Sequence, residues 1–66
     1  MGLRWTDVLE IAIELDEKYP EIDPMRIRFT DLHQWVISLD NFEDEATRGG
    51  ERILEAIQQA WIDEKD

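Results

Sequence analysis

Residues 30–39 read TDLHQWVISL and contain the clearest structural signal in the chain. The apolar residues Leu32, Trp35, Val36 and Leu39 recur at helical spacing, which places them on one face of an α-helix. Thr30 is a residue type that commonly caps a helix N-terminus, so we expect the helix to begin there. So apolar a face must be covered, and the sequence therefore predicts further helices that pack against it.

Two more stretches have the same periodicity, one on each side of the first. We expect a helix capped by Thr6 and ended by Pro20, because the residue before a proline is disfavoured in the α-region. A final helix is expected from about Glu51 to Asp63. The apolar stripes of these two helices are Val8, Ile11, Ala12, Leu15 and Tyr19, and then Ile53, Leu54, Ile57, Ala60 and Trp61.

The connections carry their own signals. Asp23-Pro24 predicts a short extra turn of helix, because proline is well tolerated at a first helical position. Arg28-Phe29 is expected to be a brief extended stretch, and Thr47 to Gly50 a turn in which Gly49-Gly50 are free to take positive φ. The expected fold is mainly α, with three helices and two short segments that pair as a vestigial β-sheet. The aromatic residues expected in the core are Trp35, Trp61, Phe29 and Phe42, while Trp5 is interpreted as a staple on the first helix.

The size and composition limit what the chain can do. Its 66 residues form one domain, residues 1–66, and it has no cysteine. Thiolate metal sites and thiol nucleophiles are therefore excluded, and the composition fits a reducing cytoplasm. Three short helices cannot enclose a substrate cleft of about 300 Å³ and keep a core. There is no glycine-rich phosphate loop, so we expect no enzyme and no tightly bound cofactor.

Charge is the strongest feature of the composition. Seventeen Asp and Glu residues face seven Lys and Arg residues, for a formal net charge of −10. Such a surface repels nucleic acid and anionic lipid, and no apolar run is long enough to span a membrane. It attracts basic protein surfaces and hard cations. The alternative is that acidity only keeps a small protein soluble and monomeric.

Four acidic residues of the first helix, Asp7, Glu10, Glu14 and Glu17, are spaced so that they fall on one face, roughly opposite the apolar stripe. Like charges at this spacing repel, and only Lys18 is near enough in sequence to relieve them. Concentration of one sign favours a site for a basic protein or a cation, with a plain solvated face as the alternative.

A second acidic cluster lies in the connection after the middle helix and comprises Asp40, Glu43, Asp44 and Glu45. Its spacing does not match an EF-hand loop. Together with Glu10, Glu14 and Glu17, these carboxylates are candidates for weak, exchangeable and unselective binding of Fe²⁺, Fe³⁺, Ca²⁺ or Mn²⁺, because hard cations take oxygen ligands. A loop without any ligand is the alternative.

The remaining polar candidates favour structural roles. His33 is the only histidine, and a lone histidine without cysteine predicts local contacts rather than a zinc or haem site. Arg26 and Arg28 are interpreted as partners of the flanking Asp23 and Asp31, with a small contact patch as the alternative.

Taken together, several motifs resemble the IscX family, small acidic proteins of bacterial iron–sulfur cluster assembly. The motifs are Trp5-Thr6-Asp7, Tyr19-Pro20 followed by Asp23-Pro24, the run from Arg28 to Trp35, Phe42 among acids, and Ile53 to Ile57 ahead of Trp61. The resemblance covers essentially the whole chain, and the linker from Ala46 to Gly50 departs from it.

The resemblance implies a modified winged-helix fold and a binding function. Its expected partner is the cysteine desulfurase that supplies sulfur, with frataxin-linked or scaffold components of the same machinery as further partners. The expected contact is the acidic face of the first helix. The expected function is an adaptor or regulator of the desulfurase that binds iron weakly, and the alternative is an iron chaperone for cluster assembly.

Overall fold

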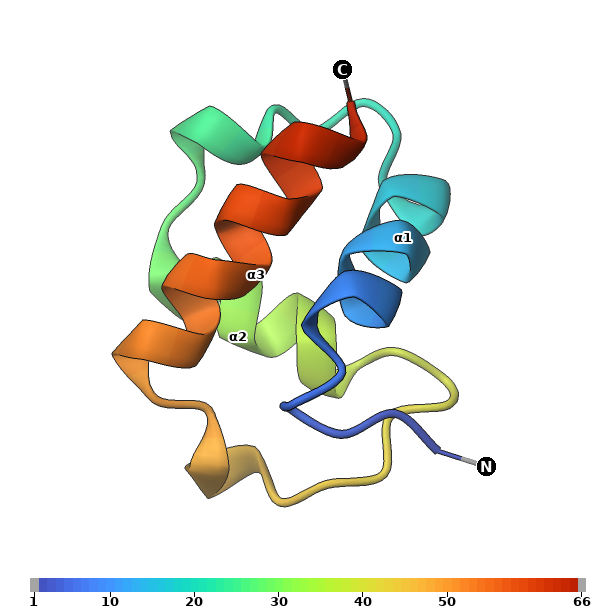
Figure 1. The fold of residues 1–66 in the computed structure, drawn as a ribbon, viewed down its shortest axis with the longest axis vertical. Helices are drawn as coiled ribbons and strands as arrows, with labels where there is room; N and C mark the ends of the chain where they lie inside the picture. The colour runs from blue at the N-terminus through green and yellow to red at the C-terminus, as the bar shows by residue number, and fades with distance from the viewer. Residues whose placement is uncertain (1, 66) are drawn as a thin grey trace.

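The computed structural model describes residues 2–65 and is built from three α-helices and two short 3₁₀ turns. The elements in chain order are α1 (Val8–Lys18), η1 (Pro24–Arg26), α2 (Phe29–Ile37), η2 (Ala46–Arg48) and α3 (Glu51–Glu64). Figure 1 shows α1 and α3 side by side, running in the same direction, with α2 crossing behind them. The mainly helical prediction is therefore confirmed.

The core forms where the three predicted stripes meet. Its buried residues are Leu3, Trp5, Ile11, Ala12, Leu15, Leu32, Val36, Leu39, Leu54, Ile57 and Trp61, each at most 9% exposed. Trp35, Phe29 and Phe42 are partly buried and pack against this cluster, as expected. Trp35 meets Trp61 edge to face, with ring centroids 6.1 Å apart.

Trp5 belongs to the core itself, which the sequence interpretation missed. It is 1% exposed and packs edge to face on Phe42 at 4.9 Å between ring centroids. Its indole Nε1 donates to the Glu45 carbonyl oxygen at 2.7 Å. The segment before α1 is thus held down by the loop that follows α2, and the two cross at the lower edge of Figure 1.

The expected small sheet does not form within residues 2–65. The only β-type pairing there is an isolated parallel bridge between Leu3 and Phe42. Arg28 has an extended backbone, but Phe29 already lies in α2, where its side chain packs against the core. A single bridge between Leu3 and Phe42 is too short to form a sheet. The winged-helix comparison stays a prediction.

Both expected threonine caps are wrong. The N-cap of α1 is Asp7, one residue after Thr6, because Asp7 N donates to the Arg4 carbonyl oxygen at 2.9 Å and closes a turn first. The N-cap of α2 is Arg28, two residues before Thr30, because entry at Phe29 places that ring on the core. Tertiary packing here outweighs the local capping preference.

The predictions for the turn at Asp23-Pro24 and for the start of the final helix are confirmed. Asp23 does cap η1, accepting from Met25 N at 3.0 Å, with Pro24 at the first position. The final helix begins at Glu51 as expected and extends one residue beyond Asp63. Gly49 and Gly50 are free to take positive φ, but both have negative φ in the structure, at −78° and −74°. Gly49 serves a different purpose, since an added Cβ would lie 2.5 Å from the Trp5 ring.

Candidate partner-binding surface

Helix α1 displays the predicted acidic residues on the side away from the core. Its inward stripe of Ile11 and Leu15 is fully buried. Glu10 and Glu17 are exposed and Glu14 is half-buried. We call Glu10, Glu14 and Glu17 the α1 acidic face. Their position follows from the 3.6-residue period, which turns them outward once the apolar stripe turns inward.

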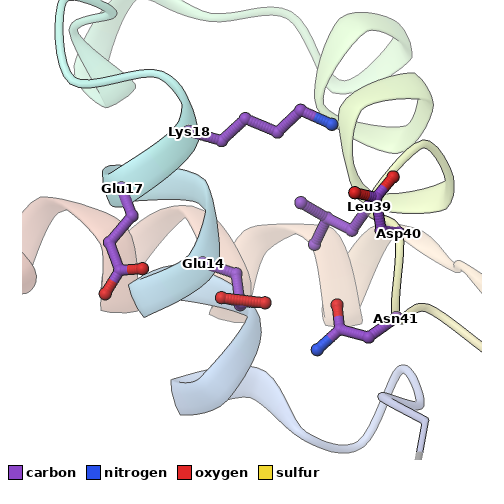
Figure 2. Close-up of a pocket in the computed structure, with 6 residues that line it drawn as sticks. All are labelled: Glu14, Glu17, Lys18, Leu39, Asp40 and Asn41. Atoms are coloured by element: carbon purple, nitrogen blue, oxygen red, sulfur yellow. The ribbon is translucent and has the colours of Figure 1, made fainter.

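An open groove of about 420 Å³ separates this face from Asp40, the first residue of the second acidic cluster. Its lining includes Glu14 and Glu17 from α1 together with Asp40 from the segment after α2. Figure 2 shows these side chains around the groove with Leu39 and Asn41. The α1 acidic face therefore adjoins Asp40 across this groove, and Lys18 also lines the groove. We call Glu10, Glu14, Glu17 and Asp40 the acidic surface.

The carboxylates of this surface form no ion pair with any described residue. Ion pairs within residues 2–65 join Arg26 to Asp23, Arg48 to Glu45 and Lys65 to Asp16, and none includes the α1 acidic face or Asp40. Uncompensated carboxylates of one sign create a negative potential above the surface.

Lys18 lines the same groove but forms no ion pair with these carboxylates among residues 2–65. Figure 2 shows its side chain reaching across the groove towards the end of α2. There its Nζ lies 3.4 Å from the Ser38 carbonyl oxygen. The Lys18 ammonium joins α1 to α2 by this contact and is paired with no carboxylate in the described part of the chain.

Other predicted acidic residues are occupied with the chain's own backbone. Asp7 accepts from Arg4 N at 2.9 Å, so the candidate partner-binding Asp7 also fixes the entry to α1. Asp44 accepts from Trp5 N at 3.1 Å and from Glu45 N at 2.8 Å. These two backbone hydrogen bonds, with help from the nearby Arg48 and Arg4, hold the pKa of Asp44 below its ordinary value.

The candidate metal ligands do not form a cage. Within residues 2–65, no three acidic or histidine side chains gather closely enough to hold a metal ion together. Among the candidate ligands of the loop, Asp44 accepts hydrogen bonds from the backbone of Trp5 and Glu45. Glu45 Oε2 lies 3.5 Å from Arg48 Nε, and Glu43 is exposed. Carboxylate oxygens suit iron as ligands. The weak iron binding expected at Glu10, Glu14, Glu17, Asp40, Glu43, Asp44 and Glu45 stays a prediction.

His33 makes structural contacts, as the sequence interpretation favoured. Its Nε2 lies 2.6 Å from the Ala46 carbonyl oxygen, which can only accept, so Nε2 carries the proton. The imidazole stacks on Trp5 with ring centroids 5.3 Å apart. His33 thereby joins α2 to η2 and covers one face of the indole.

The two arginines behave differently. Arg26 Nε lies 3.9 Å from Asp23, the expected neighbour, in an exposed ion pair of the kind that contributes little to stability. Arg28 forms no ion pair within the described part of the chain, so its expected pairing with Asp31 is not seen there.

Fold and surface together define a small helical domain whose α1 acidic face forms no ion pair within residues 2–65. Comparison with known proteins then places it in a family. The family model described as iron–sulphur cluster assembly matches residues 3–66. The chain belongs to this family, the IscX family expected from its motifs, and so has a role in iron–sulfur cluster assembly.

A relative supports the assignment over the full length. "Uncharacterized protein PA3808" of Pseudomonas aeruginosa is 59% identical over 66 residues, which is 100% of each chain. The family is one of assembly factors, and its partners belong to the same machinery. Within the described residues, no helix has the length and apolar character needed to cross a membrane.

Proposed function

We propose that this protein is an acidic adaptor that binds the cysteine desulfurase of iron–sulfur cluster assembly and modulates sulfur transfer in the cytoplasm. The observation that carries the proposal is the α1 acidic face, whose three glutamates have no ion-pair partner within residues 2–65. Membership in the cluster-assembly family supports the choice of machinery.

The mechanism in this proposal is electrostatic and steric. The negative surface of α1 and the adjoining groove attracts a basic patch on the desulfurase and speeds encounter. Once bound, the protein occupies the patch, so it slows or gates sulfur transfer and competes with other acidic components such as a frataxin-like protein. It contributes no catalytic group.

The first test is a calorimetric titration of this protein into purified cysteine desulfurase, without iron, at low and moderate salt. We expect binding that weakens steeply with salt, because the attraction is between exposed charges. No binding without iron, followed by binding on addition of Fe²⁺, would instead support the iron-chaperone alternative. Absence of binding under both conditions contradicts both.

A charge reversal on α1 sharpens the test. The double variant Glu10→Lys, Glu14→Lys should lose binding while its circular dichroism stays helical. The control is Glu51→Lys, Glu55→Lys, which makes the same change in net charge at the same spacing on exposed positions of α3. If the control loses binding equally, net charge rather than the α1 acidic face governs the interaction.

Weak iron binding by the same carboxylates is the remaining part of the proposal. Titration of Fe²⁺ and of Ca²⁺ at matched concentrations distinguishes the possibilities. A defined stoichiometry with preference for Fe²⁺ supports an iron-carrying role. Equal uptake of both ions means that the surface only collects counter-ions.

A further inference from the structure

One leucine of this protein, Leu9, is exposed to solvent although the others are buried. Leu9 is 61% exposed, whereas the other five leucines of the chain are at most 9% exposed. Among the large apolar residues described, only Met25 is comparably exposed, at 70%. Leu9 lies in the first turn of α1, on the helix that carries the acidic face.

The neighbours of Leu9 extend this apolar spot along α1. Residues four apart on a helix lie one above the other, so Leu9 is followed by Ile13. Ile13 is half-buried and does not belong to the core cluster or to the residues packed on it. Glu10 and Glu17 lie three residues before and four after Ile13. A short apolar strip therefore borders the unpaired carboxylates.

We infer that Leu9, continued by Ile13, is the apolar anchor of the partner-binding surface. The partner it fits is a protein surface with an apolar socket about one helical turn from its lysines or arginines. The inference rests on the proposed function and deepens it. Its basis is charge complementarity, because the acidic residues beside the strip attract a basic protein surface. When that surface docks on α1, it also covers the strip, and an apolar socket is the contact that stabilises the buried Leu9 side chain.

Charge and apolar contact have separable effects on binding. Surface charges chiefly set the rate of encounter and its salt dependence. A buried apolar anchor chiefly sets how slowly the complex dissociates, and a few such residues carry much of the binding energy. An apolar strip beside a charged face is also the arrangement in which amphipathic helices enter partner grooves.

The test measures association and dissociation rates with cysteine desulfurase for single variants. Leu9→Gln keeps a good helix former at an exposed position, so the fold should be retained. We expect about tenfold weaker binding, nearly all of it from faster dissociation, with an unchanged salt slope. Glu17→Gln should instead slow association and flatten the salt slope.

Met25→Gln is the matched control, since it removes the other exposed apolar side chain from η1, outside α1. It should bind as the parent does. If Leu9→Gln dissociates no faster than the parent, or no faster than Met25→Gln, the inference is wrong while the charge-driven adaptor stands. If the parent shows no salt-sensitive binding at all, the proposed function fails and the anchor fails with it.

Discussion

Two acidic regions of this small protein use the same residue types for opposite purposes. On the α1 acidic face the carboxylates have no ion-pair partner within residues 2–65. In the loop after α2, Asp44 accepts two backbone N–H groups and Glu45 offers its carbonyl oxygen to Trp5. We call the cluster of Trp5, His33, Asp44, Glu45 and Gly49 the loop junction.

The difference lies in what surrounds each carboxylate. In the loop junction, the backbone N–H groups of Trp5 and Glu45 need an acceptor. A carboxylate held in place by the chain is a stronger acceptor for them than water. Beyond the first turn of α1, Glu14 and Glu17 have none, because the N–H groups there are already bonded within the helix. The Asp44 carboxylate therefore helps to hold the fold, while the carboxylates of the α1 acidic face make no such contact among the described residues.

Replacement of Trp5 by alanine should have the largest effect on stability. It opens a cavity beside Phe42 and His33 and removes the bond to the Glu45 carbonyl oxygen. We expect a loss of about 3–5 kcal/mol in the free energy of unfolding, measured by urea denaturation. Trp5→Phe retains most ring contacts and should lose much less. Equal urea midpoints for Trp5→Ala and the parent would show that the loop junction does not hold the fold.

The next largest effect on stability is expected at Gly49, and the adjacent Gly50 is its control. A Cβ at Gly49 would lie 2.5 Å from the Trp5 ring and 2.9 Å from His33, whereas one at Gly50 would meet nothing within 4 Å. Gly49→Ala should therefore cost about 1–3 kcal/mol through overpacking. Gly50→Ala should stay within roughly 0.5 kcal/mol of the parent in the same denaturation experiment. Similar results for both variants would mean that the indole moves aside freely.

Asp44 makes part of the stability depend on pH. Its pKa in the folded protein is lowered from 3.8, so the ionised carboxylate stabilises the fold above that value. The contribution declines as pH falls below 3.8 and through the lowered pKa. Asp44→Asn should unfold at lower urea than the parent at pH 7, and the difference should shrink on acidification.

Glu43→Gln is the control for this titration, because it removes an exposed charge from the neighbouring position. It should not reproduce the pH-dependent difference. A gap between parent and Asp44→Asn that stays constant down to pH 2 would mean that the hydrogen bonds to Trp5 and Glu45 do not depend on the charge.

The smallest effect is expected on α1, and with the opposite sign. Glu14→Gln removes a like-charge neighbour of both Glu10 and Glu17, so we expect a gain of about 0.2–0.5 kcal/mol per pair at low salt. The gain should vanish at high salt. A loss of more than 1 kcal/mol would place Glu14 among the residues that hold the fold.

Much of the fold could be predicted because its stripes are strongly periodic. The final helix begins at Glu51 in both prediction and structure, and Trp61 is buried as expected. The α1 acidic face could also be predicted, since it follows from the same period. Its junction with Asp40 could not, because that depends on where the chain after α2 returns to α1.

Trp5 shows why other parts of the fold could not be predicted from the sequence. Its burial depends on partners about forty residues away, and a helical period does not report such contacts. The one local signal is the alternation of Leu3 and Trp5, which is typical of an extended segment with one buried side. Thr30 failed as a cap for the same reason, since the packing of Phe29 on the core fixed the entry to α2. Thr6 failed for a local reason, the turn that Asp7 closes with Arg4.

The pairing of α1 with α3 has a consequence for how the chain is made. The inward stripe of α1 is covered chiefly by α3, which is synthesised after α1 and α2. Until Trp61 emerges from the ribosome, Ile11 and Leu15 have no complete core to enter. Because the decisive contacts join α1 to α3, folding has to wait until α3 has been made, and we expect nascent chains that stop before residue 51 to remain open to proteases.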